Sequence, residues 1–403
     1  METTTAYITR PIGFKASGVS AGLKGEGLLD VGLVVSECPC NAAGVYTSNL
    51  VKGHSLQRSI NILNKKQKIR GMITNSKNAN AAVGPAGLKD ADDIASAVAG
   101  ELGCSADEIL TASTGVIGFR MPTDKIISAV PSLVSSLGND YENAHNAELA
   151  MMTTDTVPKE VCAEVTFKDN SKVTIAAIAK GSGMIHPNLA TMISIFTTDA
   201  GIETDLLYEI LKNAVKHTFN RVSVDGDTSV CDEVVIMANG MSGVKIEKGS
   251  EDYDIFAEAV TDLANDIARI IASDGEGATK FVEIECFNAK TEKDAYLVVS
   301  AVAKSPLCKT AIFGMDANCG RILTAAGYSG ADFDPDKIDI RLNGHLFYKD
   351  GIAVPFDEDE AAKLLKVHDI KIEIDLKDGA CYDRMYTCDF SYEYVRINGD
   401  YRS

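Results

Sequence analysis

One stretch of the sequence combines the residue types that acyl transfer requires. It begins at Lys180, where an apolar segment ends, contains Gly181 and Gly183, and reaches Thr191, where another apolar segment begins. A threonine hydroxyl becomes a nucleophile when a base removes its proton, and an N-terminal threonine carries such a base in its own α-amine. The glycines permit the backbone angles of a strained turn. Thr191 is therefore a candidate nucleophile, although a plain hairpin between two strands has the same pattern.

The segments around this stretch predict how it is held. Apolar, β-branched residues at 161–167 and 172–179 flank a polar turn and predict a hairpin whose second strand ends at Lys180. The next predicted strand, 191–197, begins at the candidate nucleophile. Apolar spacing of three and four residues predicts helices at 91–102, 206–215 (with Thr204 as N-cap) and 253–272.

Three further strands are predicted near the C-terminus, at 338–342, 370–376 and 385–397. Strands and helices do not alternate strictly. This mixture favours a layered α/β (mixed α+β) fold over a doubly wound sheet.

Composition excludes several functional classes. The chain has 403 residues, 45% of them hydrophobic, and a net charge of −18, which argues against nucleic-acid binding. No apolar segment approaches the roughly 18 residues of a membrane span, and the polar N-terminus lacks a signal core, so we expect a cytoplasmic enzyme. The ten cysteines form no C-x-x-C pair and the six histidines no H-x-x-x-H pair, so we expect no metal.

The stretch from Lys180 to Met192 resembles the self-cleavage site of the ornithine acetyltransferase family, the arginine biosynthesis bifunctional proteins. Seven further segments resemble the same family in the same order, so that the likeness covers nearly the whole chain: 75–81, 111–118, 151–156, 223–229, 274–280, 314–321 and 394–403. Two residues depart from the family pattern: Lys77 stands where glycine is usual, and Cys319 where tryptophan is usual.

The resemblance implies stacked β-sheets flanked by helices, in a self-cleaving, N-terminal-nucleophile-like architecture. It implies a cut between Ala190 and Thr191, giving fragments 1–190 and 191–403 that share one composite fold. Thr191 is then the nucleophile, while the Thr114 hydroxyl and the Gly115 N–H form the oxyanion hole. The residues that match substrate contacts are Thr154, Lys180, Thr191, Glu276, Asn398 and Ser403.

These segments also have plain structural interpretations. Thr114-Gly115 is typical of a strand ending in a turn, Thr154 of a helix cap or turn, and Glu276-Gly277 of a helix C-cap. Only their combination favours a catalytic site.

The activity implied by the resemblance is transfer of acetyl from N-acetyl-L-ornithine to L-glutamate through an acetyl-threonine, without a cofactor. Acetyl-CoA stays open as a second acyl donor, which would make the enzyme bifunctional. The resemblance also implies a heterotetramer of two copies of each fragment. Two alternatives remain: an N-terminal-nucleophile amidase or aminopeptidase that passes the acyl group to water, and a non-catalytic binding protein that retains the fold.

Overall fold

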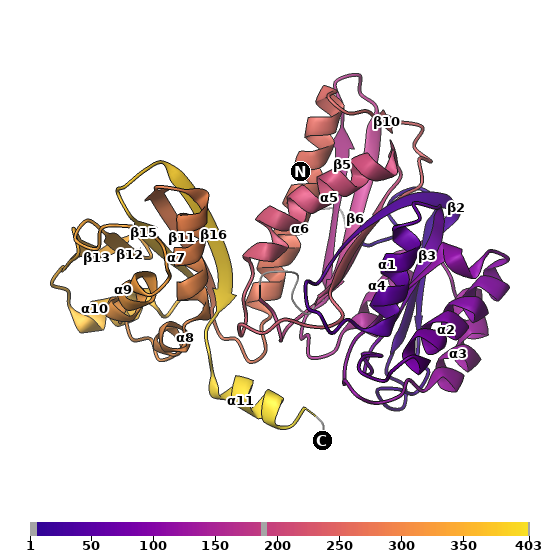
Figure 1. The fold of residues 1–403 in the computed structure, drawn as a ribbon, viewed down its shortest axis with the longest axis horizontal. Coiled ribbons are helices and arrows are strands. Elements are labelled where there is room, and N and C mark those ends of the chain that lie inside the picture. The colour runs from indigo at the N-terminus through magenta and orange to yellow at the C-terminus, as the bar shows by residue number, and fades with distance from the viewer. Residues whose placement is uncertain (1–5, 187–191, 402–403) are drawn as a thin grey trace. The chain divides into compact units, whose positions relative to one another are not determined.

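The computed structural model describes residues 6–186 and 192–401, which divide into two compact units (Figure 1). Among the described residues, the first unit runs to Gly181 and takes in 192–220 and 228–267. The second contains 182–186, 221–227 and 268–401. The chain thus passes from one unit to the other between Gly181 and Ser182.

The first unit is built on one eight-stranded sheet. Its order is β4-β3-β2-β9-β7-β6-β5, with β1 paired to β2. The strands are β1 (Phe14–Val19), β2 (Val31–Tyr46), β3 (Ile69–Asn75), β4 (Ile109–Ser113), β5 (Lys159–Thr166), β6 (Lys172–Lys180), β7 (Ile193–Thr198) and β9 (Glu233–Ala238). β3–β4 and β7–β9 are parallel, and the other neighbours are antiparallel. A separate two-stranded sheet pairs β8 (Gly201–Ile202) with β10 (Lys245–Ile246).

The long strand β2 folds this sheet into two stacked layers. Its first part pairs with β1 and β3, and its last six residues pair with β9. One buried apolar cluster takes Met72 and Leu110 from the first layer and Ile178, Ile195 and Val235 from the second. The stacking predicted from the sequence is therefore present, and apolar burial holds the layers together.

Helices cover the layers of the first unit. They are α1 (His54–Leu63), α2 (Ala86–Leu102), α3 (Thr123–Ser135), α4 (Tyr141–Met151), α5 (Thr204–His217) and α6 (Glu251–Ser273), the last of which continues into the second unit. α2 and α3 pack against β2, β3 and β4 in a second apolar cluster. α4 packs on β1 and α5 on β2.

The second unit has its own six-stranded sheet and core. The strand order is β14-β13-β12-β15-β11-β16, and only β11–β15 is parallel. The strands are β11 (Phe281–Ala289), β12 (Asp339–Leu342), β13 (His345–Lys349), β14 (Ile352–Ala353), β15 (Asp369–Asp375) and β16 (Cys381–Cys388). The helices are α7 (Glu292–Lys304), α8 (Pro306–Phe313), α9 (Cys319–Gly327), α10 (Glu358–Leu364) and α11 (Tyr392–Gly399). Cys319 lies buried in this core at the start of α9, so its departure from the family pattern is a matter of packing.

No single helix among the described residues has both the length and the apolar character of a membrane span. Only the bent pair of α7 and α8 meets those two criteria when taken together.

Most predicted elements are confirmed. The hairpin is β5–β6, the three predicted helices are α2, α5 and α6, and two predicted C-terminal strands are β12 and β15. Two predictions were wrong. Thr204 is the first residue of α5 and not its cap, which is Glu203. The strand predicted over 385–397 ends at Cys388, because the Ser391 hydroxyl accepts the Glu393 N–H and starts the helix α11.

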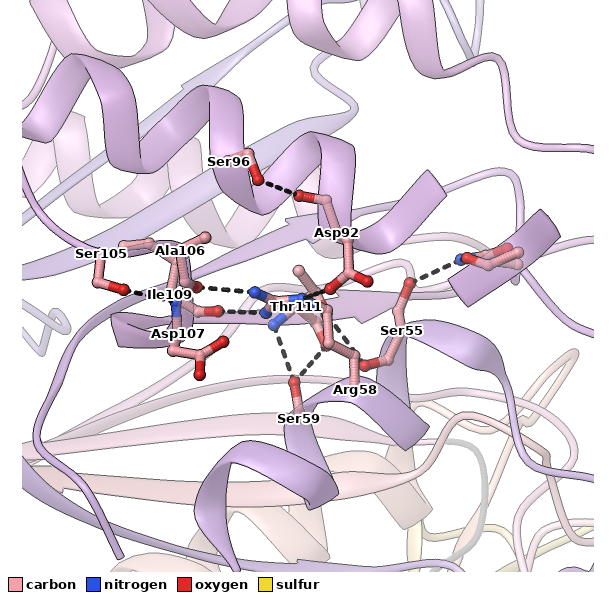
Figure 2. A network of polar contacts seen from close by, with 12 residues as sticks. Ser55, Arg58, Ser59, Asp92, Ser96, Ser105, Ala106, Asp107, Ile109 and Thr111 are labelled. Carbon is pink, nitrogen blue, oxygen red and sulfur yellow. Dashed lines mark hydrogen bonds and ion pairs between the residues drawn. The ribbon is translucent and has the colours of Figure 1, made fainter. Parts of the chain in front are cut away.

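A buried arginine fixes β4 beneath α1 and α2 (Figure 2). The Arg58 guanidinium donates to the Ile109 and Ala106 carbonyls at 2.6 and 2.7 Å, and to Asp92 at 2.7 Å. Ser59 next to it exchanges two hydrogen bonds with the Thr111 backbone. The strand that leads to Thr114 is thus held by polar contacts as well as by apolar packing.

We expect Arg58→Met to lower the free energy of unfolding of the first unit by about 2–4 kcal/mol, because it removes the donors to the buried Ile109 carbonyl and to the Ala106 carbonyl. Asp92→Asn is the matched control and should cost less than about 1 kcal/mol, since the Asp92 side chain is 57% exposed. Urea unfolding of the three proteins measures both values. Equal stabilities of the two variants would contradict this role of Arg58.

Candidate active site

Thr114 and Gly115 offer two free hydrogen-bond donors directly after β4. Thr114 is 3% exposed, and its backbone N–H donates to the Asn75 carbonyl at 3.0 Å. The Thr114 hydroxyl and the Gly115 N–H donate to no residue in the part of the chain that the structure describes. Adjacent, unused donors in a largely buried position are what a developing oxyanion requires.

The segment 75–81, for which no chemical role was predicted, shapes this turn. Gly115 has φ +130°, and a Cβ there would lie 2.2 Å from the Lys77 carbonyl carbon, so that only glycine fits. The Val116 N–H donates to the Lys77 carbonyl, and the Ala79 N–H donates to the Val116 carbonyl, both at 3.0 Å. Beneath them, the Ser113 hydroxyl donates to the Asn75 side chain at 2.6 Å.

The same network reaches the start of β7. The Cys231 thiol donates to the Ala79 carbonyl at 3.3 Å. The next residue, Asp232, accepts the Met192 N–H at 3.1 Å. Ile193 follows in β7 and pairs with Lys180 of β6. The structure therefore connects the Thr114-Gly115 turn with the segment that begins one residue after Thr191.

Lys180 is a buried cation without a direct partner. Its side chain is 2% exposed, and its ammonium group makes no hydrogen bond or ion pair with any described residue. A buried ammonium group without a direct hydrogen-bonding partner is costly, even with the Asp155 carboxylate nearby. This arrangement suits an anionic group of a ligand.

Asp155 ties Lys180 to the predicted substrate turn. Its carboxylate accepts the Gly181 N–H at 2.6 Å, the Thr153 N–H at 2.9 Å and the Lys159 ammonium at 2.8 Å. Burial opposes its ionisation, but the ammonium groups of Lys180 and Lys159 outweigh burial and lower the pKa of Asp155. Thr154, half-buried between two anchored neighbours, is thereby fixed close to the end of β6.

A second lysine supports the same turn from the helix before it. The Lys24 ammonium donates to the Leu149 and Ala150 carbonyls of α4, at 3.2 and 3.3 Å. Burial lowers the pKa of Lys24 to about 8, against the attraction of Asp30 and Asp155. Lys24 thus stabilises the helix end from which residues 152–155 emerge.

The second unit brings Glu276 and Asn398 together. The Asn398 amide donates to the Glu276 carboxylate at 2.7 Å, and the Glu276 N–H donates to the Ser182 carbonyl at 2.9 Å. A Cβ at Gly183 would lie 2.2 Å from the Glu276 carboxyl carbon, so the glycine makes room for that carboxylate. Asp225 closes the loop by accepting the Met184 and Ile185 N–H groups at 2.6 and 3.0 Å.

The predicted site residues therefore fall into two groups. Thr114, Gly115, Thr154 and Lys180 belong to the first unit, while Glu276 and Asn398 belong to the second. Three predicted residues, Ala190, Thr191 and Ser403, lie outside the described residues.

Comparison with known proteins decides the family. The model of the ArgJ family matches residues 15–403. The chain belongs to the ArgJ family. This confirms the resemblance and places the chain among the acyltransferases of arginine biosynthesis.

Two relatives agree with this assignment, and two solved structures are similar to parts of the chain. The arginine biosynthesis bifunctional protein ArgJ of Caldanaerobacter subterraneus subsp. tengcongensis is 44% identical over 408 residues, with 100% of both chains covered. That of Symbiobacterium thermophilum is 42% identical over 410 residues, again covering 100% of both. A crystal structure of argJ from Bacillus halodurans is 39% identical with a TM-score of 0.49, covering 51% of this chain and 96% of that one. The ornithine acetyltransferase from Mycobacterium tuberculosis, complexed with ornithine, is 40% identical with a TM-score of 0.42, covering 45% and 95%.

Several residues of this ArgJ chain were missed from the sequence. Asp155 and Asp225 lie in segments that resemble the family. In the segment of Asp155 only Thr154 was predicted to contact substrate, and in the segment of Asp225 no residue was assigned a role. Both could have been predicted from an acidic residue within a turn, because a carboxylate there can accept hydrogen bonds from several backbone N–H groups at once. Asp232 gave no such signal, because an acidic residue before a strand normally faces solvent.

Lys77 carries a backbone strain that follows from its place beside Gly115. It is a non-glycine residue with φ +77°. We expect Lys77→Gly to raise the free energy of unfolding by about 0.5–1 kcal/mol, because glycine adopts this conformation without steric cost. Lys77→Ala is the matched control: it removes the same charge, keeps the strain and should not stabilise. Urea unfolding tests this, and equal stabilisation by both variants would contradict it.

Proposed function

We propose that this ArgJ protein transfers acetyl from N-acetyl-L-ornithine to L-glutamate, after cutting itself between Ala190 and Thr191 into fragments 1–190 and 191–403. The observation that carries the proposal is the connection between the Thr114-Gly115 turn and the start of β7, beside Lys180. Among the described residues, the two donors of that turn and the Lys180 ammonium have no direct partner. Membership of the ArgJ family supports it. So do the relatives named arginine biosynthesis bifunctional protein.

In the first half-reaction the new α-amine of Thr191 takes the proton of its own hydroxyl, and Oγ attacks the acetyl carbonyl. The Thr114 hydroxyl and the Gly115 N–H stabilise the oxyanion, an effect worth about 3–4 kcal/mol per donor. The amine returns the proton to the departing nitrogen of ornithine, and an acetyl ester remains on Thr191. The amino group of glutamate then attacks this ester and leaves as N-acetylglutamate, restoring the free threonine.

The remaining predicted residues bind substrate in this proposal. The ammonium of Lys180 makes no direct hydrogen bond or ion pair with the described residues, which suits the α-carboxylate of the amino-acid substrates. Thr154 adds a hydroxyl close to it. Glu276, oriented by Asn398, takes the side-chain amine of ornithine, and Ser403 is assigned a contact by the resemblance alone. No cofactor takes part in these steps.

Strand order supports the idea that the fragments stay together after the cut. β2, β5 and β6 precede residue 191 and β7 and β9 follow it, yet β7 and β9 lie between β2 and β6 in one sheet. Separating the fragments would break two strand pairings, β2–β9 and β6–β7, and open the core that they share. We extend the proposal to a heterotetramer of two copies of each fragment, and to a cytoplasmic location.

The word bifunctional in the names of the relatives supports acetyl-CoA as a second acyl donor. Incubation of the enzyme with acetyl-CoA and glutamate tests this extension. We expect N-acetylglutamate and free thiol in equal amounts, while absence of both would limit the enzyme to N-acetylornithine.

Thr191→Ala should yield one uncut chain without acetyl transfer, because alanine lacks the hydroxyl oxygen that attacks the Ala190 carbonyl in the cut and the acetyl carbonyl in the transfer. Intact mass and N-terminal sequencing distinguish the uncut chain from the wild-type fragments. Two fragments of normal size from the variant would contradict the assignment. In the wild type, N-acetylornithine with glutamate should give N-acetylglutamate, whereas release of acetate at the same rate would instead favour a hydrolase.

Gly183→Ala should raise the KM for N-acetylornithine several-fold and leave cleavage intact. The added methyl would displace the Glu276 carboxylate, while the backbone at Gly183 already has angles that alanine adopts. Ser182→Ala is the matched control in the same loop, since its hydroxyl contacts the Asp274 carbonyl and not Glu276. Steady-state kinetics of both variants measure the effect. An unchanged KM in Gly183→Ala would remove Glu276 from the binding site.

A further inference from the structure

Two buried acidic residues at the start of β9 have no place in the mechanism above. Asp232 and Glu233 are both 0% exposed. In the part of the chain that the structure describes, neither the Asp232 Oδ2 atom nor either Glu233 carboxyl oxygen has a hydrogen-bond partner. Burying unpaired carboxyl groups is costly, and a native structure that keeps them calls for a reason.

Both residues contact Met192 at the head of β7. The Met192 N–H donates to Asp232 Oδ1 at 3.1 Å, and the Glu233 N–H donates to the Met192 carbonyl at 3.1 Å. The Met192 nitrogen is covalently bonded to the carbonyl carbon of residue 191. The Asp232 carboxyl therefore contacts the backbone N–H of the residue that directly follows the one whose amine a cut would release.

The groups around the acidic pair supply too little positive charge. Lys180 from β6 attracts Asp232, but burial dominates and raises the pKa of Asp232 well above its usual value. Burial and the Asp232 carboxyl raise the pKa of Glu233 in the same way. From β2, Tyr46 faces Glu233, and burial followed by Glu233 raises the pKa of that phenol. Burial, Asp232 and Glu233 likewise raise the pKa of the Cys231 thiol, so neither Tyr46 nor Cys231 is a cation.

One further cation would allow one of the two carboxyl groups to ionise. Two adjacent buried carboxyls resist carrying two charges, whereas a carboxylate and an ammonium group in contact stabilise each other. Lys180 is shared with Asp155, whose ionised form it stabilises. A cut before residue 191 creates one new amine close to Asp232.

We propose that Asp232 is the counter-ion of the α-ammonium group that Thr191 acquires when the chain is cut. This inference rests on the proposed function. Before the cut the Asp232 carboxyl holds its proton. After the cut the carboxyl and the new amine share one proton as a carboxylate–ammonium pair. Loss of that proton to solvent, above the pKa of the amine, gives the unprotonated amine that accepts the Thr191 hydroxyl proton, and the ammonium group formed in this step again pairs with the Asp232 carboxylate. The amine then passes the proton to the departing nitrogen, and no further reactant is needed.

The test is the pH dependence of acetyl transfer by purified Asp232→Asn, which keeps the oxygen that accepts the Met192 N–H. Activity requires the unprotonated amine, so it rises with pH through the pKa of that amine. Loss of a nearby carboxylate lowers this pKa by about one unit or more. We therefore expect the acid limb of the kcat–pH profile to shift to lower pH by about one unit. The maximal kcat should fall about tenfold or more, and KM should change little.

Glu233→Gln is the matched comparison, because it removes an equally buried carboxyl from the adjacent position. The acid limb of its kcat–pH profile should coincide with that of the wild type. Asp232→Glu keeps the charge and should keep the wild-type limb even where kcat falls. An unchanged limb in Asp232→Asn, or equal shifts in Asp232→Asn and Glu233→Gln, would overturn the proposal.

Cleavage gives a second readout. The Asp232 carboxyl is uncharged before the cut, so Asp232→Asn should be cut like the wild type and thereby acquire the amine that the pH profile reports. An uncut Asp232→Asn would show that the carboxyl acts before the amine exists and would overturn the proposal. Failure of the underlying function is seen separately, because the wild type itself would then neither cut itself nor transfer acetyl.

Discussion

The carboxylate of Asp155 is the contact on which the first-unit part of the candidate site depends. It is buried between Lys159 and the end of β6, and it accepts two backbone N–H groups in addition to the ammonium group. Such a group orients its neighbours strongly, because a buried carboxylate is stable only while ammonium groups and N–H donors together compensate its charge. Through it, the turn that carries Thr154 and the strand end that carries Lys180 form one rigid piece. Lys180 itself keeps its ammonium available for a ligand.

Two unusual backbone conformations, at Gly115 and Lys77, likewise fix the position of site residues in the first unit. Gly115 has a conformation and a contact with Lys77 that exclude any side chain, and Lys77 adopts a left-handed conformation to permit that contact. Strain at such positions persists only where the surrounding structure enforces it. Here the enforcement comes from the Asn75 and Ser113 side chains and from the Arg58 network below β4. The result is a pair of donors that need no rearrangement to meet an oxyanion.

Many of the strands and helices could be predicted from the sequence, because they depend on residues close together in the chain. The hairpin β5–β6 and the helices α2, α5 and α6 follow from apolar spacing and turn residues, which depend on near neighbours. Asp155, Asp232 and the role of the segment around Lys77 depend on partners 26 to 152 residues away, as in the contacts Gly181–Asp155 and Cys231–Ala79, and no spacing rule reveals them. The C-terminal helix α11 was missed because its apolar residues alternate as in a strand, while one capping serine determines its start. Resemblance to the family supplied the catalytic assignments that local pattern could not.

The central claim is that Thr191 becomes an amino terminus and carries the acetyl group. Its most direct test is peptide mass spectrometry of the wild-type enzyme after incubation with N-acetylornithine in the absence of glutamate. We predict a peptide that begins at Thr191, gains the mass of one acetyl group on the threonine oxygen, and loses it again when glutamate is added. A peptide from which no acetylated threonine is recovered, while N-acetylglutamate still accumulates, would contradict this account.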